Sequence, residues 1–385
     1  MTSLSIEIEL VQAVASFVPD HVVRSGVAGQ PPKPGDVFAS EGAAIFADVA
    51  GFTIMAERLA RVMRDQTQYA EPRGAEELNR IINRAFSAMM MPIRQRGGVV
   101  VHFSGDALTA YLERPSDLSP SDVAKSALAC AHAMHQAIAP FAEVQVKDET
   151  FAVSVKIGVG YGPAAFLVVG DEHSNMELVL AGPAIRDAAS AEGYAERGQV
   201  ILAPSAWSLL LDPALPTDHH LEPRDVSVAP LECRVVSPPE DDVALLPPAD
   251  DPLVGLDVVA HERLRRDLAP YLPQSIYDRL LLAQGDLPGD YRRVTNLFVF
   301  FDGLDSAKYS LKSSNAPDGM AKAWGDPLDL GKKAQEYYHW AHTIVDRYEG
   351  RLIRMLVDDK GTNLHILFGA PDKHADDPAR GLRCA

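Results

Sequence analysis

Residues 43–53 read AAIFADVAGFT, and this stretch decides the fold of the half of the chain that contains it. Its first five residues form a short apolar run, which is typical of a buried β-strand. Asp48 follows the run directly, and the residues from Gly51 pass into a helical pattern that extends from Ile54 to Val62. We therefore expect a buried strand that ends near a carboxylate and leads at once into a helix.

The residues downstream have the pattern of a mixed α+β domain. The expected elements are helices at about 75–95 and 121–139, a hairpin at 99–112, strands at 152–158, 177–180 and 199–202, and a helix from Pro183. The turn of the hairpin is Ser104-Gly105-Asp106. This order makes the hairpin and the strand that ends near Asp48 candidates for neighbours in one sheet.

The same pattern recurs after a proline-rich segment. A strand is expected at 293–300, a helix at about 333–348 and a second hairpin over 350–368. Asp48 and Asp106 are 58 positions apart, and Phe300 and Asp359 are 59 apart. This spacing indicates internal duplication. The second copy stops at Ala385, about half-way through the content of the first, so we expect it to be incomplete.

The repeat sets the expected domain boundaries. They are an N-terminal helix and linker at 1–39, the first copy at 40–205, a Pro-rich linker with a short helix at 206–290, and the N-terminal half of the second copy at 291–385.

Composition excludes several classes of protein. The 385 residues include 36 basic and 53 acidic side chains, and the net charge of −17 argues against a general nucleic-acid binder. The three cysteines lie far apart, which indicates free thiols in a reducing compartment. No apolar run is long enough to span a bilayer and the N-terminus has no secretory pattern, so we expect a cytoplasmic protein.

Two aspartates point to chemistry. If their strands are neighbours, Asp48 and Asp106 converge on one edge of the sheet, and hard carboxylate oxygens suit Mg²⁺. The residues Ala50, Gly51, Phe52 and Thr53 open the following helix, where N–H groups attract phosphate. Either aspartate alone is more typical of a turn or a helix cap, so the combination favours a metal and phosphate site.

These residues resemble the class III nucleotide cyclases. The resemblance is carried by residues 46–53 (FADVAGFT), 103–107 (FSGDA) and 155–160 (VKIGVG). The tandem arrangement, with 368–371 (FGAP) in the second copy, resembles the soluble, bicarbonate-responsive adenylyl cyclases and their bacterial relatives. It implies an α+β fold of two ferredoxin-like (βαββαβ) domains, the second incomplete, which pair within the chain and bind ATP at their interface.

The resemblance implies an adenylate cyclase that converts ATP to 3′,5′-cyclic AMP and pyrophosphate in intracellular signal transduction. Asp48 and Asp106 would be the catalytic residues and, with the Val49 carbonyl, would hold two Mg²⁺ or Mn²⁺ ions. The N–H groups of residues 50–53 would cradle the polyphosphate. Lys156 stands where the family has a basic phosphate contact, and a solvated strand lysine is an equal alternative.

The second copy departs from the first. Phe300 stands where Asp48 stands, and Asp302 could replace it only if the strand register shifted by two residues. The first copy would therefore hold the metals and the second would recognise the base. Arg354 and Asp359 stand at the base-recognition positions, where a cation favours ATP over GTP. A solvated strand arginine and a hairpin-turn aspartate are the alternatives.

Other family positions are also altered. The Asn and Arg that act on the ribose and the transition state correspond to Arg186 and Ser190 in the first copy, and their second-copy counterparts would lie beyond Ala385. A truncated cyclase that acts as a non-catalytic nucleotide-binding or dimerisation module is therefore the alternative function, and homo-oligomers stay open. His102 and Ala189 occupy the bicarbonate-binding positions, so we do not expect the same bicarbonate response.

Overall fold

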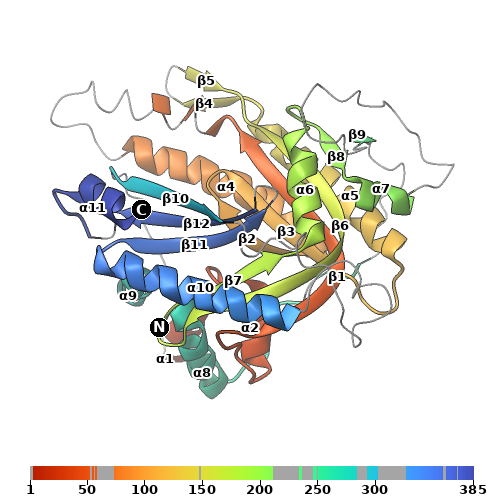
Figure 1. Cartoon of the computed structure of the whole chain (residues 1–385). Helices are drawn as coiled ribbons and strands as arrows, with labels where there is room; N and C mark the ends of the chain where they lie inside the picture. Colours follow the sequence, from red (N-terminus) through yellow and green to blue (C-terminus); the bar gives the residue numbers. More distant parts are fainter. Residues whose placement is uncertain are drawn as a thin grey trace. The chain divides into compact units, whose positions relative to one another are not determined.

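A computed structural model provides the structure of the chain (Figure 1). It describes residues 3–52, 54–55, 57–58, 73–146, 149–210, 234–235, 246–248, 250–283, 293–301, 327–358, 361–370 and 372–385. The chain divides into two compact units. Unit 1 consists of residues 1–39, 163–182 and 250–385, and unit 2 consists of residues 40–162 and 183–249. Each unit is described by itself, and the domain boundaries expected from the repeat stay a prediction.

A mixed β-sheet organises unit 2. Its strands are β1 (Val37–Ala50), β2 (Val99–Ser104), β3 (Ala107–Glu113), β6 (Ser154–Asp171), β8 (Val200–Leu202) and β9 (Arg234–Val235), and β7 (Ser174–Ala181) pairs with the far end of β6. A separate small ladder joins β4 (Val144–Val146) to β5 (Glu149–Phe151). The order in the sheet is β2-β3-β1-β6-β8-β9. Its helices are α4 (Arg73–Gln95), α5 (Pro120–Ile138), α6 (Pro183–Gly193) and α7 (Pro204–Trp207), with short 3₁₀ turns at Ala139–Phe141 and Ser208–Leu210. The expected mixed α+β fold and the strand–helix–hairpin order are confirmed.

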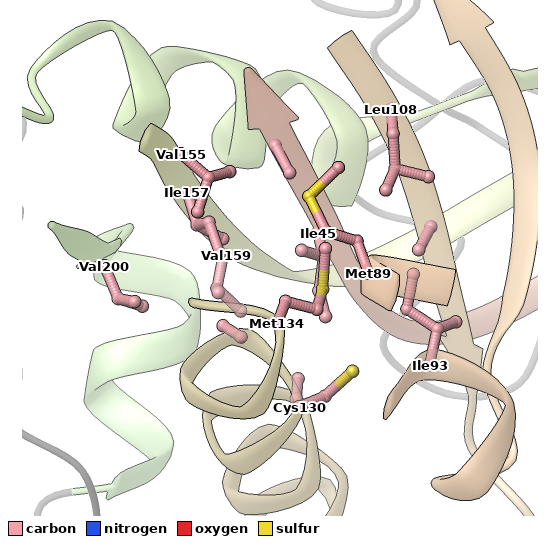
Figure 2. Packing of buried hydrophobic residues seen from close by; sticks show 14 of the residues in the cluster. Ile45, Met89, Ile93, Leu108, Cys130, Met134, Val155, Ile157, Val159 and Val200 are labelled. Carbon is pink, nitrogen blue, oxygen red and sulfur yellow. The ribbon is translucent and has the colours of Figure 1, made fainter. Parts of the chain in front are cut away.

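The core of unit 2 lies between one face of this sheet and the helices α4 and α5. Successive residues of a strand point to opposite faces, and the odd-numbered residues of β1 from 43 to 49 are all buried in this core. Figure 2 shows Ile45 of β1 among side chains of the strands and both helices, which include Met89, Ile93, Leu108, Cys130, Met134, Val155, Ile157 and Val159. Asp48 consequently belongs to the opposite face of the sheet.

Helix α6 packs on that opposite face, against the backbone of β6. At Gly158 a Cβ would collide with the carbonyl oxygen of Ala188 and the amide nitrogen of Glu192. At Gly160 a Cβ would collide with the carbonyl oxygen of Ala184. Glycine at these two positions lets the helix approach the strand closely, which fixes where the side chains of α6 lie over the sheet.

Unit 1 contains a second, smaller sheet. Its strands are β10 (Thr295–Phe301), β11 (Arg351–Asp358) and β12 (Gly361–Phe368), in the order β10-β12-β11, and α10 (Pro327–Arg347) and α11 (Asp377–Cys384) belong to the same unit. Both neighbouring pairs are antiparallel. In unit 2, β1 and β2 flank β3 in the same way. That the two copies form a head-to-tail tandem stays a prediction.

The far end of the β6–β7 hairpin completes the core of unit 1. Ala165, Leu167 and Val169 of β6, together with β7 (Ser174–Ala181), are buried among residues of α10, β11 and β12. The Gln335 side chain of α10 bonds both the N–H and the carbonyl of Gly170, at 2.8 Å each. The Tyr338 hydroxyl donates to the backbone carbonyl of Asn175, 3.1 Å away. The hairpin is thus held by side-chain to backbone hydrogen bonds as well as by apolar packing.

A buried carboxylate joins this hairpin to β11. Glu177 of β7 accepts a hydrogen bond from the backbone N–H of Met355 at 2.9 Å, and its Oε1 lies 3.6 Å from Nε of Arg354. The Glu177 side chain is 16% exposed. Burial raises the pKa of Glu177 to about 7, against the opposing effects of Arg354 and the Met355 N–H.

Four helices that precede the second sheet in the sequence complete unit 1. They are α1 (Ser3–Ala15), α2 (Asp20–Val27), α8 (Val258–Leu268) and α9 (Gln274–Ala283), with a 3₁₀ turn at Ala269–Tyr271. Arg265 of α8 ties three of them, because its Nε lies 2.6 Å from Glu7 Oε1 and its Nη1 donates to the Tyr277 hydroxyl at 2.5 Å. Among the residues that the structure describes, no helix is both long and apolar enough to cross a bilayer.

Some elements differ from the expectation. β1 begins at Val37, ahead of the apolar run, and β6 continues through the glycine-rich segment to Asp171. The N-terminal helix ends at Ala15, and Pro19 precedes a separate helix, α2. Helices α8 and α11 were not expected. The expected helix at 54–62 is described only at 54–55 and 57–58, where it is helical, and about half of the linker at 206–290 lies outside the described residues.

Replacing Gly158 with Ala should destabilise unit 2. The added methyl group would meet the backbone of α6, and overpacking of this kind costs about 1–3 kcal/mol. Urea unfolding of the full chain measures the loss. Gly193→Ala, at the end of the same helix where a Cβ meets nothing within 4 Å, is the matched control and should not destabilise. Equal stability of the two variants would contradict the close packing of α6 on β6.

The stability of unit 1 should depend on pH through Glu177. Unfolding restores the ordinary pKa of 4.5, so between this value and about 7 the folded state binds more protons than the unfolded state. The free energy of unfolding therefore falls as pH rises through this window, by about 3 kcal/mol. Urea unfolding at pH 5 and pH 8 should show this loss in the wild type relative to Glu177→Gln. Glu172→Gln, at an exposed position in the hairpin turn, should behave as wild type. Parallel profiles for wild type and Glu177→Gln would refute the assignment.

Candidate functional site

Asp48 lies near the end of β1, and Asp106 lies in the turn just before the neighbouring strand β3, at the same end of the sheet. Asp48 is paired in register with Ala107, the residue after Asp106. The backbone N–H of Val49 donates to the carbonyl oxygen of Asp106 at 3.0 Å. Gly105, with φ of 64°, forms the tight turn that places Asp106 at the start of β3. The predicted neighbourhood of the two aspartates is therefore present in the backbone.

The chain turns sharply from β1 into a helix directly after Asp48. Gly51 has φ of 113°, and a Cβ there would collide with the carbonyl oxygen of Ala152. Phe52 and Met55 are buried in the core of unit 2 and anchor the first turn, and the N–H of Met55 bonds the Gly51 carbonyl at 3.1 Å. Of the predicted phosphate cradle, Ala50, Gly51 and Phe52 are described and Thr53 lies outside the described residues.

Lys156 of β6 bridges two carboxylates on the face opposite the core. Its Nζ lies 3.2 Å from Asp48 Oδ2 and donates a hydrogen bond to Glu192 Oε1 of α6. Burial on its own would lower the pKa of Lys156, but the hydrogen bonds and charges of Glu192 and Asp48 outweigh it and raise the pKa. Lys156 is thus held as a cation beside Asp48, and it is not the solvated strand lysine of the alternative interpretation.

Among the described residues of the second sheet, a phenylalanine takes the ladder place of Asp48. Both hairpins carry a register irregularity, between Val100 and His102 in β2 and between Leu352 and Arg354 in β11. Counting along the ladders from these irregularities, Phe300 occupies the place of Asp48 and is 58% exposed. Asp302 and Asp359 lie outside the described residues.

Arg354 follows the irregularity of β11 and stands where His102 stands in β2. Its partner in unit 1 is the buried Glu177. An arginine in this ion pair keeps a fixed position on the strand, and its side chain is still 30% exposed. The expectation that Arg354 contacts a base stays a prediction, and the solvated alternative does not account for the Glu177 pair.

The remaining family positions lie on α6 and β2. Arg186 neighbours Asp187, whose pKa is raised by burial although a hydrogen bond with Ser205 opposes the rise. Ser190 is half-buried, and Ala189 is buried. His102 contacts the Thr109 hydroxyl at 3.2 Å. Nothing in these contacts tests the bicarbonate positions.

The donor set fits Mg²⁺ or Mn²⁺ that bind with nucleotide. Such ions take one or two carboxylates and leave the other positions to water and phosphate oxygens, and Asp48 and Asp106 offer two carboxylates. An ammonium already pairs with Asp48, so this carboxylate accepts a cation. Within the described ranges no group of three or more His, Cys, Asp and Glu side chains could hold a metal by itself. The Val49 carbonyl stays a predicted ligand.

Sequence reasoning missed two carboxylates, Glu192 and Glu177. Glu192 stands in the last turn of a helix otherwise rich in alanine, where the helix dipole disfavours a negative charge. An acid at this position could therefore have been recognised from the sequence as one that needs a positively charged partner. The sequence contains no such indication for Glu177, because the alternating pattern of a strand does not show which side chains pack against it.

The chain is similar to known nucleotide cyclases. The family described as Adenylate and Guanylate cyclase catalytic domain matches residues 39–228. Human adenylate cyclase type 10 is 26% identical over 393 residues, which cover 97% of this chain and 22% of the human protein. The mouse protein of that name is 32% identical over 196 residues, 51% of this chain and 11% of the mouse protein. Among solved structures, the adenylyl cyclase CyaB from P. aeruginosa has a TM-score of 0.42 and 18% identity, covering 54% of this chain and 99% of that chain.

The chain spans about a fifth of the length of human adenylate cyclase type 10, so the match is to one part of that protein. The matched family region contains Asp48, Asp106, Lys156 and Glu192. This chain therefore carries an adenylyl and guanylyl cyclase catalytic domain and belongs to the class III nucleotide cyclases.

Proposed function

We propose that this chain converts ATP to 3′,5′-cyclic AMP and pyrophosphate, as a cytoplasmic enzyme of signal transduction. The observation that carries the proposal is the adjacency of Asp48 and Asp106 in the β1–β3 ladder, directly before the turn at Gly51. Similarity to human adenylate cyclase type 10 over 97% of this chain supports adenylate cyclase activity.

Each residue has a part in this proposal. Asp48 and Asp106 hold the divalent cations, and the N–H groups at residues 50–53 bind the polyphosphate. The bound ions supply Lewis-acid chemistry, which activates the ribose 3′-hydroxyl and neutralises the leaving pyrophosphate. Lys156 lies beside Asp48 and contacts a phosphate oxygen, which concentrates positive charge where the reaction develops negative charge.

The choice of ATP over GTP is assigned to the second copy. Arg354 is a strand cation whose side chain remains partly exposed, and a donor there suits the ring acceptors of adenine. Glu177 holds this arginine in place. Asp359 is proposed as the second contact to the base.

A non-catalytic nucleotide-binding or dimerisation module is the second candidate function. The observation that favours it is Phe300 in the ladder position of Asp48, which leaves a single carboxylate pair in the described ladders. At the positions of the first copy that correspond to the family's Asn and Arg, this chain has Arg186 and Ser190. This difference also favours a non-catalytic module. Assay of the reaction separates the two functions.

Asp48→Asn and Asp106→Asn should each abolish activity. Each change removes the charge that holds a divalent cation, and we expect cyclic AMP formation from Mg·ATP or Mn·ATP to fall at least ~1,000-fold. Asp117→Asn, at an exposed loop position of unit 2, is the matched control. A variant that folds and keeps its turnover would overturn the metal assignment. A folded wild type that binds ATP and forms no cyclic AMP would favour the non-catalytic module.

Arg354 should set the affinity for ATP. The test compares Glu177→Gln with the double variant Glu177→Gln/Arg354→Gln, because the double variant removes the cation without leaving a buried carboxylate unpaired. We expect the double variant to raise the KM for ATP about tenfold over the single variant, with a smaller change in kcat. The preference for ATP over GTP should fall in parallel. Equal KM values would contradict the base contact.

A further inference from the structure

The carboxylate of Glu192 is built into the site and has no part in the proposed chemistry. Its side chain is 11% exposed and accepts a hydrogen bond from Lys156 Nζ, which also lies 3.2 Å from Asp48 Oδ2. One ammonium thus bridges two carboxylates that come from different elements, β1 and α6. A buried charge requires a partner of opposite sign, so the pairing is obligatory for Glu192.

The backbone fixes Glu192 over Lys156. A Cβ at Gly158 would collide with the amide nitrogen of Glu192, so the last turn of α6 rests directly on β6 two residues from Lys156. The carboxylate therefore stays over the lysine without depending on a mobile loop.

The position of Glu192 works against the helix that carries it. It belongs to the last turn of α6, where the helix dipole favours positive charge and disfavours a carboxylate. Lys156 compensates by bringing an ammonium to the same helix end. Helix stability thus gives no reason for the acid, whereas the ammonium beside Asp48 does.

A divalent cation on Asp48 and the Lys156 ammonium compete for the same carboxylate. Both are positive, and at 3.2 Å the ammonium occupies one lone-pair position of Asp48 Oδ2. A divalent cation bound to Asp48 therefore repels Lys156 and weakens its pair with this carboxylate. Glu192 already accepts a hydrogen bond from Lys156 and can neutralise the ammonium by itself. The ammonium therefore stays next to the phosphates instead of moving into solvent.

We propose that Glu192 is a positioning residue, which holds Lys156 beside Asp48 and takes over the ammonium when Asp48 binds a divalent cation. This inference rests on the proposed function, since it requires that Asp48 be a cation ligand. Glu192 acts through Lys156 and does not touch the metal.

The proposal predicts how cation affinity responds to substitutions. Glu192→Gln leaves Asp48 as the remaining carboxylate in the pair with Lys156, so the ammonium competes harder and Mn²⁺ should bind about tenfold more weakly. Lys156→Met removes the competitor and should tighten binding. If Glu192 acts only through Lys156, adding Glu192→Gln to Lys156→Met should change the Mn²⁺ affinity less than about twofold.

The experiment is calorimetric titration of the full chain with Mn²⁺, without nucleotide. Glu196→Gln is the matched control, because it removes the same charge from an exposed position just after α6 and should bind as wild type. A Glu192→Gln variant that binds like Glu196→Gln would overturn the proposal. An equal loss with and without Lys156 would also overturn it, because Glu192 would then act directly on the cation.

Two further measurements keep the test decisive. If Glu192→Gln does not fold, a second experiment uses the wild type. The protein is treated with acetic anhydride, and mass spectrometry measures the rate at which Lys156 is acetylated. Saturating Mn²⁺ should change its rate less than about twofold, and release of Lys156 into solvent, seen as a large acceleration, would overturn the proposal. Asp48→Asn reports on the proposed function: Mn²⁺ binding unchanged in this variant removes the metal assignment itself, whereas its loss there with no effect of Glu192→Gln removes only the present inference.

Discussion

The alternation of side chains along β1 is the constraint on which the site depends. The odd-numbered residues from Ala43 to Val49 fill the core under α4 and α5, so Asp48 has to face the other side of the sheet. A shift of one residue would bury the carboxylate among apolar side chains and expose the core residues, which makes this register strongly specified. Core packing therefore determines where Asp48 lies.

The register of β1 also sets the positions of the other parts of the site. The ladder with β3 places Asp106 next to Asp48, and the turn at Gly51 starts a helix directly beyond it. On the same face, the glycines of β6 let α6 approach until Glu192 meets Lys156. In the resulting cluster the Lys156 ammonium lies between the carboxylates of Asp48 and Glu192.

The second sheet repeats features of the first three strands of unit 2. It keeps the strand order and the irregularity of the first hairpin but has Phe300 at the position of Asp48. With the acid gone, the ladder position of His102 is held by Arg354, which pairs with Glu177 of the β6–β7 hairpin. The first ladder thus carries the carboxylate pair, whereas the second carries an arginine that pairs with Glu177 of the β6–β7 hairpin.

Sequence patterns predicted the elements whose signals are local. The apolar run before Asp48, the hairpin around Gly105 and the 3.6-residue period of α4 and α5 each lie within one segment, and the structure has all of them. Elements that depend on distant partners were missed or shortened. The start of β1 contains Ser40 and Glu41, which look unlike a buried strand until Glu113 and Tyr161 supply their hydrogen bonds. The continuation of β6 needs glycines because α6 lies on it.

The sequence did not predict the ion pairs for the same reason. Lys156 and Glu192 are separated by 36 positions, and Glu177 and Arg354 by 177, so no short window of sequence contains both partners. Only the placement of an acid at the end of α6 gave a local hint, through its conflict with the helix dipole.

Crystals grown with Mn²⁺ and a non-hydrolysable ATP analogue test the central claim most directly, because anomalous scattering locates the metal independently of any assay. The account predicts anomalous peaks in direct contact with the carboxylate oxygens of both Asp48 and Asp106, next to the analogue's phosphates. Peaks that touch neither aspartate, with the analogue bound, would contradict it.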